Sequence, residues 1–250
     1  MAKLRLPAFL LPPLLAVGAA SAAPQPAEPS VEDAHVVSQS RMFSVSGGDS
    51  LRMGAIASRA DEIFLQVCEL LGVDRRWKYS VSIRLLGQPG DPAVANHIRT
   101  RIAVISGEPN FQIRIYPGGG LDVNRLTNAI ITMVLYERAL RNVPANSFPE
   151  KVSMPDWLVT GVQQALLWKR GRADRHLYQN LFNRAEMLSP EEIISTESPW
   201  KLDASSRQIY EVSCGVLLQC LINQPGGQAS LRELVTEAAT VEGTPREIIS

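Results

Sequence analysis

The sequence predicts an α+β fold in which a small N-terminal β-sheet with one helix precedes a helical C-terminal half, built around one buried helix. Three observations predict it. Segments with alternating β-branched and aromatic residues gather between residues 41 and 116, as half-buried strands require. Residues 122–140 are apolar on nearly every side, which is typical of a buried helix. Beyond residue 155, apolar spacing and capping residues indicate further helices.

The first 22 residues have the composition of a secretory signal peptide. Lys3 and Arg5 precede an apolar run that ends at Ala20, and Ala20-Ser21-Ala22 offers a cleavage site. Prolines interrupt the run, which is shorter than the roughly 20 residues of a membrane-spanning helix. We therefore expect an exported protein, periplasmic or extracellular and soluble, with no stable membrane insertion.

The remaining chain divides into a linker and one domain. Residues 23–40 start with a Pro- and Ala-rich stretch without apolar periodicity, which indicates an extended linker. Residues 41–250 then form a single domain. Thr244-Pro-Arg-Glu247 has the pattern of a helix start three residues before the end, so we expect either a truncated C-terminus or a frayed last turn.

The 25 basic and 25 acidic residues argue against nucleic acid and against an anionic membrane as partners.

The elements of the N-terminal half follow from alternation and from glycine. Period-2 patterns predict strands at 41–46, 78–86, 100–105 and 111–116. Between the first two strands, apolar residues at helical spacing predict a helix that Asp49 or Ser50 caps and that Gly72 ends. The segment from Tyr116 to Gly120 joins a strand to a helix; we interpret it as a tight turn rather than an anion-binding loop, because no Lys-Ser/Thr follows it.

The C-terminal half reads as a series of helices. The buried helix covers 122–140, and a second helix starts at Pro155-Asp156 and ends at Lys169-Arg170. Further helices are predicted at 177–186, from the capping box at Ser189, at 209–223, and from a second capping pattern at Ser230.

This layout, with a second helix that opens Pro-Asp-Trp-Leu-Val-Thr-Gly at 155–161, resembles the peptidase MA-like, gluzincin-type zinc metallopeptidases. The resemblance runs from Phe43 to the C-terminus and implies a gluzincin-like α+β domain. In that family the buried helix carries His-Glu-x-x-His, whose histidines bind zinc while the glutamate activates water. The second helix supplies a glutamate as the third ligand.

All four functional positions of that family are replaced here. Asn128 stands where the first histidine would be, and Thr132 where the second would be. Ala129 replaces the catalytic glutamate, and Thr160 replaces the third ligand. Asparagine and threonine are poor zinc ligands, and alanine cannot take a proton from water.

No shift of register restores the motif. The chain has three histidines, and His35, His97 and His176 lie on neither predicted helix. We therefore expect no catalytic residue, no metal and no cofactor, and interpret the chain as a pseudoenzyme with a binding or structural role and an unknown protein or peptide partner. Two alternatives stay open: a hydrolase that uses an unrecognised non-zinc site, and an envelope protein-interaction module.

Several other residues have a functional and a structural interpretation. Glu137 and Arg138 could form a relocated catalytic pair, but we favour a solvated or ion-paired helix end. Cys68 could pair with Cys214 or with Cys220, but we favour three buried thiols. The four tryptophans could line a ligand groove, but we favour partly buried core for Trp77, Trp157, Trp168 and Trp200.

Overall fold

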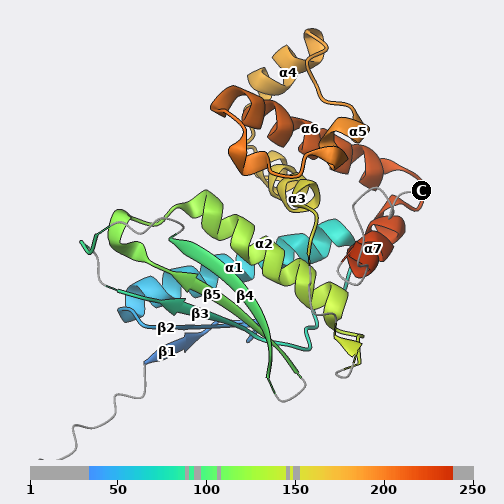
Figure 1. Ribbon diagram of the computed structural model, residues 1–250. Coiled ribbons are helices and arrows are strands. Elements are labelled where there is room, and N and C mark those ends of the chain that lie inside the picture. Colours follow the sequence, from blue (N-terminus) through green and yellow to red (C-terminus); the bar gives the residue numbers. More distant parts are fainter. Residues whose placement is uncertain are drawn as a thin grey trace, which may run out of the picture. The chain divides into compact units, whose positions relative to one another are not determined.

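The computed structural model in Figure 1 describes residues 34–87, 90–92, 97–105, 108–144, 147–148 and 153–238. These residues belong to one compact unit. Its architecture is α+β, as predicted: a mixed five-stranded sheet and, within the described ranges, seven α-helices. The predicted signal peptide, most of the predicted linker and the segment at 244–247 lie outside the described residues. No helix among those described has the length and apolarity to cross a membrane.

The sheet has the strand order β1-β2-β3-β5-β4, in which β2, β3 and β5 are parallel and the edge strands β1 and β4 are antiparallel to their neighbours. The strands are β1 (His35–Val37), β2 (Phe43–Ser46), β3 (Val81–Leu85), β4 (Ile98–Ile105) and β5 (Glu108–Ile115). The linker prediction for 23–40 is wrong at its end, because β1 lies within it. A three-residue strand is too short for a detectable pattern, and pairing with β2 defines it.

The helices are α1 (Ser50–Leu71), α2 (Val123–Leu140), α3 (Asp156–Lys169), α4 (Arg175–Asn183), α5 (Pro190–Ser195), α6 (Ala204–Asn223) and α7 (Gly227–Ala238), with short 3₁₀ turns η1 (Pro117–Gly119) and η3 (Pro199–Lys201). Asp49 caps α1, Gly72 ends it in the left-handed conformation, and Ser189 forms the predicted capping box of α5. Two predicted helix starts are wrong. Helix α6 begins at Ala204, after the Asp203 cap and five residues before the predicted start at 209, and Ser230 lies inside α7 instead of at its start.

One face of the sheet is buried and the other is polar. Helix α1 lies against β1 and β2, α2 lies against β4 and β5, and the two helices contact each other (Figure 1). Along β5 the residues alternate between buried and half-buried. In the opposite, polar face, Arg84, Arg114 and Arg99 are cross-strand neighbours in one row. In β2, β3 and β5 every second residue is therefore buried beneath the helices, which positions α2 over the sheet.

Helices α3 and α6 approach closely because each presents a glycine to the other. A Cβ on Gly161 would lie 2.9 Å from the Cys214 carbonyl oxygen, and one on Gly215 would lie 2.7 Å from Gln164 Cβ. A real Cβ atom essentially never lies this close to another heavy atom, so both positions require glycine for this packing. The glycine of the Trp-Leu-Val-Thr-Gly segment thus has a packing role in this chain.

Candidate functional site

The main candidate site is a cavity of about 1450 Å³ bounded by α2, α3 and α6. Three of the four positions singled out in the sequence line it: Asn128 and Thr132 from α2, and Thr160 from α3. Ala129 is buried and does not line it. The structure therefore brings together residues 32 positions apart in the chain, Asn128 and Thr160, at one concave surface.

Helical spacing places these side chains. On α2, four lining residues recur at every fourth position, Asn124, Asn128, Thr132 and Tyr136, and Arg125 lines the cavity beside them. Residues with this spacing share one face of a helix. Ile131 and Met133 of the same helix are buried in the core and do not line the cavity.

The second wall comes from α3 and the third from α6. On α3, Asp156, Thr160 and Gln163 form another stripe at helical spacing, and Tyr210 and Glu211 of α6 face them. Strand β4 adds Thr100, and the segment from α5 to η3 adds residues that include Glu197 and Trp200. An edge strand of the sheet thus borders a cavity whose other walls are helical.

The hydrogen bonds within the cavity leave some groups unsatisfied. The Thr132 hydroxyl donates to the Asn128 backbone carbonyl at 2.8 Å, so its proton is already engaged. The Asn128 side-chain oxygen is buried and has no hydrogen-bond partner among the described residues. Tyr136 accepts a hydrogen bond from the Met154 N–H at 2.9 Å, and burial raises the pKa of its hydroxyl.

Acidic groups outnumber basic ones in the cavity wall. Asp156 keeps an exposed surface, but partial desolvation by the cavity wall raises the pKa of its carboxyl group. Burial also raises the pKa of Glu211, and the nearby Arg207 offsets only part of this effect. Neither carboxyl group forms an ion pair within the described part of the chain.

Histidine and a cluster of metal ligands are both missing from the described cavity wall. None of the three histidines lines it: His35 is on β1, His97 directly precedes β4, and His176 is on α4. Within the described ranges no three His, Cys, Asp or Glu side chains are grouped to hold a metal ion. The wall offers hydroxyl, amide, carboxyl and aromatic groups, which are able to bind and orient a ligand.

Comparison with known proteins does not extend this description. No family model, no curated protein and no solved structure matches the chain.

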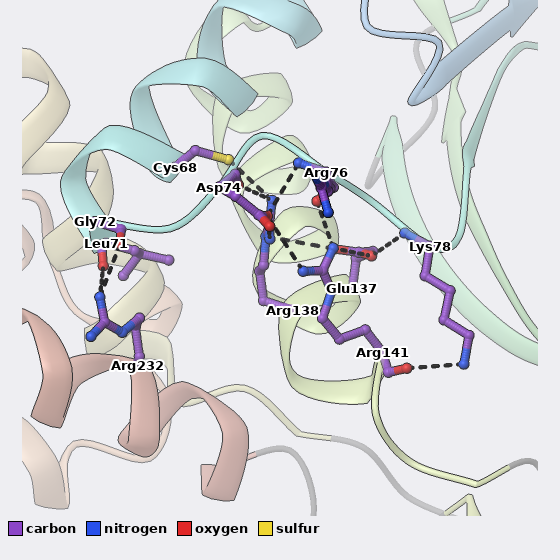
Figure 2. Close-up of polar contacts among 10 residues, drawn as sticks. All are labelled: Cys68, Leu71, Gly72, Asp74, Arg76, Lys78, Glu137, Arg138, Arg141 and Arg232. Carbon is purple, nitrogen blue, oxygen red and sulfur yellow. Dashed lines mark hydrogen bonds and ion pairs between the residues drawn. The ribbon is translucent and has the colours of Figure 1, made fainter.

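The residues Glu137 and Arg138 form part of a buried ion cluster rather than a catalytic pair (Figure 2). Glu137 is fully buried, accepts the Lys78 N–H at 2.7 Å and pairs with Arg141 at 3.2 Å. Arg138 donates to the Asp74 carbonyl oxygen at 2.9 Å and lies 3.6 Å from the Glu137 carboxylate. The predicted ion-paired helix end is confirmed, but it is buried instead of solvated. Its contacts attach the segment after α1 to α2.

The remaining candidates also resolve into structural roles, with corrections. Tyr116 and the glycines after it form the predicted tight turn, η1. All three cysteines are free thiols, Cys68 and Cys214 are buried, and the prediction of a buried Cys220 is wrong because it faces solvent at the end of α6.

Two of the tryptophans differ from the predicted core assignment. Trp157 is buried and Trp77 is half-buried, whereas Trp168 and Trp200 are exposed. Trp157 and Trp200 both line the cavity. Sequence reasoning missed Trp200, Tyr210 and Glu211 as site residues, because only folding brings η3 and α6 next to α2. For α3, the polar stripe at helical spacing that starts at Asp156 was the one sequence signal that could have indicated more site residues.

Proposed function

We propose that this chain is an exported, non-catalytic protein with a metallopeptidase-like fold that binds an extended segment of a peptide or protein in the cavity between α2, α3 and α6. The observation that carries the proposal is the cavity itself. It is large, it is lined by hydrogen-bonding and aromatic side chains, and no histidine reaches it. Concave sites with a few convergent polar groups are the usual form of a binding site.

Strand β4 supports an extended ligand. It is an edge strand, and none of the described strands pairs with its outer side. An edge strand offers a row of backbone N–H and C=O groups to an added strand. Because Thr100 of β4 lines the cavity, a peptide that adds to β4 would place its side chains against the cavity wall.

Loss of hydrolysis follows from the residues at the positions that resemble the zinc motif. Hydrolysis of a peptide bond needs an activated water or a nucleophile with a base close to it. Asn128, Thr132 and Thr160 provide neither a metal ligand set nor a general base at neutral pH. The replacements at these three positions support the loss of zinc-dependent hydrolysis, and we propose binding without turnover.

The test is selection of peptides from a random display library on the purified mature chain, followed by titration of a selected peptide. Thr160→Trp adds an indole into the cavity, and we expect it to weaken binding at least tenfold. Gln208→Trp is the matched control, because Gln208 is exposed on α6 outside the cavity.

Three results would overturn the proposal. Unchanged affinity of the Thr160→Trp protein would place the partner elsewhere and favour an interaction module that does not use the cavity. Failure to select any peptide would remove the binding role. Cleavage of the selected peptide would favour a hydrolase with an unrecognised site.

A further inference from the structure

The charges of the cavity wall are unbalanced. Four carboxyl groups line it, from Asp122, Asp156, Glu197 and Glu211, against the guanidinium groups of Arg125 and Arg207. Arg125 is paired with Asp122, with 3.5 Å between nitrogen and oxygen. That pair leaves three carboxyl groups and one arginine.

The remaining arginine is largely engaged with the backbone. Arg207 donates to the Trp200 carbonyl oxygen at 2.7 Å and to the Leu202 carbonyl oxygen at 3.0 Å. It lowers the pKa of Glu211 without overcoming the effect of burial, and the two side chains do not form an ion pair. Within the described residues, Asp156 and Glu197 have no cationic partner either. The cavity is therefore a negatively charged site.

A second, independent feature points to a missing donor or acceptor. Tyr210 lines the cavity, is 1% exposed, and its hydroxyl has no hydrogen-bond partner in the described part of the chain. Burial raises the pKa of Tyr210, and the adjacent Cys214 thiol adds to the shift without meeting hydrogen-bond geometry. An unmade hydrogen bond at a buried polar group is unfavourable, so a ligand donor that reaches this hydroxyl would stabilise the complex.

An aromatic side chain completes the set. Trp200 lines the cavity and is 61% exposed, which is unusual for the largest apolar side chain. Tryptophan is the strongest aromatic partner for an ammonium or guanidinium group. A metal ion is a poorer match for this wall, because no described cluster of three His, Cys, Asp or Glu side chains exists to hold one.

We infer that the cavity recognises a lysine or arginine side chain of the bound peptide, whose positive charge pairs with Asp156 and Glu211 while the Tyr210 hydroxyl accepts a hydrogen bond and Trp200 covers the cation. This inference rests on the proposed function and specifies its ligand. Carboxylates and aromatic rings together discriminate cationic from neutral side chains, because a neutral group would leave the carboxylates unpaired.

The peptide selection also tests this inference. We expect selected peptides to share a lysine or arginine at one position. Replacing that residue by acetyl-lysine, or by citrulline for arginine, keeps the shape and removes the charge; affinity should fall about tenfold or more, as loss of one partly desolvated charge pair predicts. Asp156→Asn and Glu211→Gln should each reduce the preference for the charged peptide, with Glu233→Gln as the control because Glu233 is exposed on α7 outside the cavity.

The outcomes separate this inference from the proposed function. Selected peptides without a shared cationic residue, or equal affinity for charged and acetylated forms, would overturn the inference and leave peptide binding intact. An equal effect of Glu233→Gln would also overturn it, since general attraction would then explain the preference. If no peptide is selected, both fail.

Discussion

The buried carboxylate of Glu137 gives the sharpest prediction about stability. Glu137→Gln preserves its shape but removes the charge that faces two guanidinium groups. The carboxylate is 0% exposed, accepts the Lys78 N–H at 2.7 Å, and lies 3.2 Å from Arg141 and 3.6 Å from Arg138. Arg138 would stay buried, with the half-exposed Asp74 as its nearest counter-ion at 3.3 Å. Removing one partner of a buried ion pair costs about 3–5 kcal/mol, and we expect a loss in this range.

The assay is urea unfolding, because guanidinium chloride would screen the charges under test. The matched control is Glu62→Gln. Glu62 also meets two arginines, Arg59 at 2.8 Å and Arg170 at 3.1 Å, but its side chain is 48% exposed. For exposed ion pairs about 0–1 kcal/mol is expected. A loss below about 1 kcal/mol for Glu137→Gln, or one equal to that of the control, would refute the reasoning from burial.

Three further predictions concern the backbone, the thiols and pH. Gly47 has φ +87° and a Cβ there would overlap the Leu85 carbonyl, so Gly47→Ala should destabilise the fold by more than about 1 kcal/mol in thermal melting. Gly54 is the control: it lies on α1 with open space around it, so Gly54→Ala should stabilise the fold by about 0.5–1 kcal/mol. Titration with a thiol reagent should label Cys220 alone in the native protein and all three cysteines after unfolding; fast labelling of a second thiol would contradict the burial of the others. Binding of the cationic peptide should weaken as the pH falls from 7, because protonation removes the charges of Asp156 and Glu211. Burial raises the pKa of both carboxyl groups, so the loss of affinity should begin at a higher pH than ordinary carboxyl groups, with a pKa of about 4, would give. Affinity that stays constant down to pH 4 would contradict this.

Elements with a strong local signal were predictable from the sequence. Helix α2 is apolar on most of its faces, and the structure buries most of its residues against the sheet, α1 and α3. Helix α5 begins at the Ser189 capping box because its side chains satisfy backbone N–H groups locally, independent of the rest of the fold. Both signals depend on residues within one turn or one helix, which is the range over which sequence patterns are informative.

Elements that depend on tertiary contacts were not predictable in the same way. Strand β1 has three residues and exists through its pairing with β2. The start of α6 was placed too late, because its first turn is polar and its start is marked by the Asp203 cap instead of by apolar spacing. On the same helix, Cys214 is buried and Cys220 is exposed, a difference that only the packed structure defines.

The candidate site was predictable in part for the same reason. Asn128, Thr132 and Thr160 could be found because each lies on a helix with a recognisable pattern. Trp200, Tyr210 and Glu211 belong to segments without a motif, and they join the cavity only when α6 packs on α3. Two of the four carboxyl groups in the cavity wall, from Glu197 and Glu211, also come from these later segments.

The central claim is that the cavity binds a peptide without cleaving it. It is tested most directly by mass spectrometry of a saturating selected peptide after prolonged incubation with the purified chain and added zinc. The account predicts that the peptide is recovered intact, with and without a chelator. Fragments that accumulate with zinc and disappear with the chelator would show a working metal centre and contradict the account.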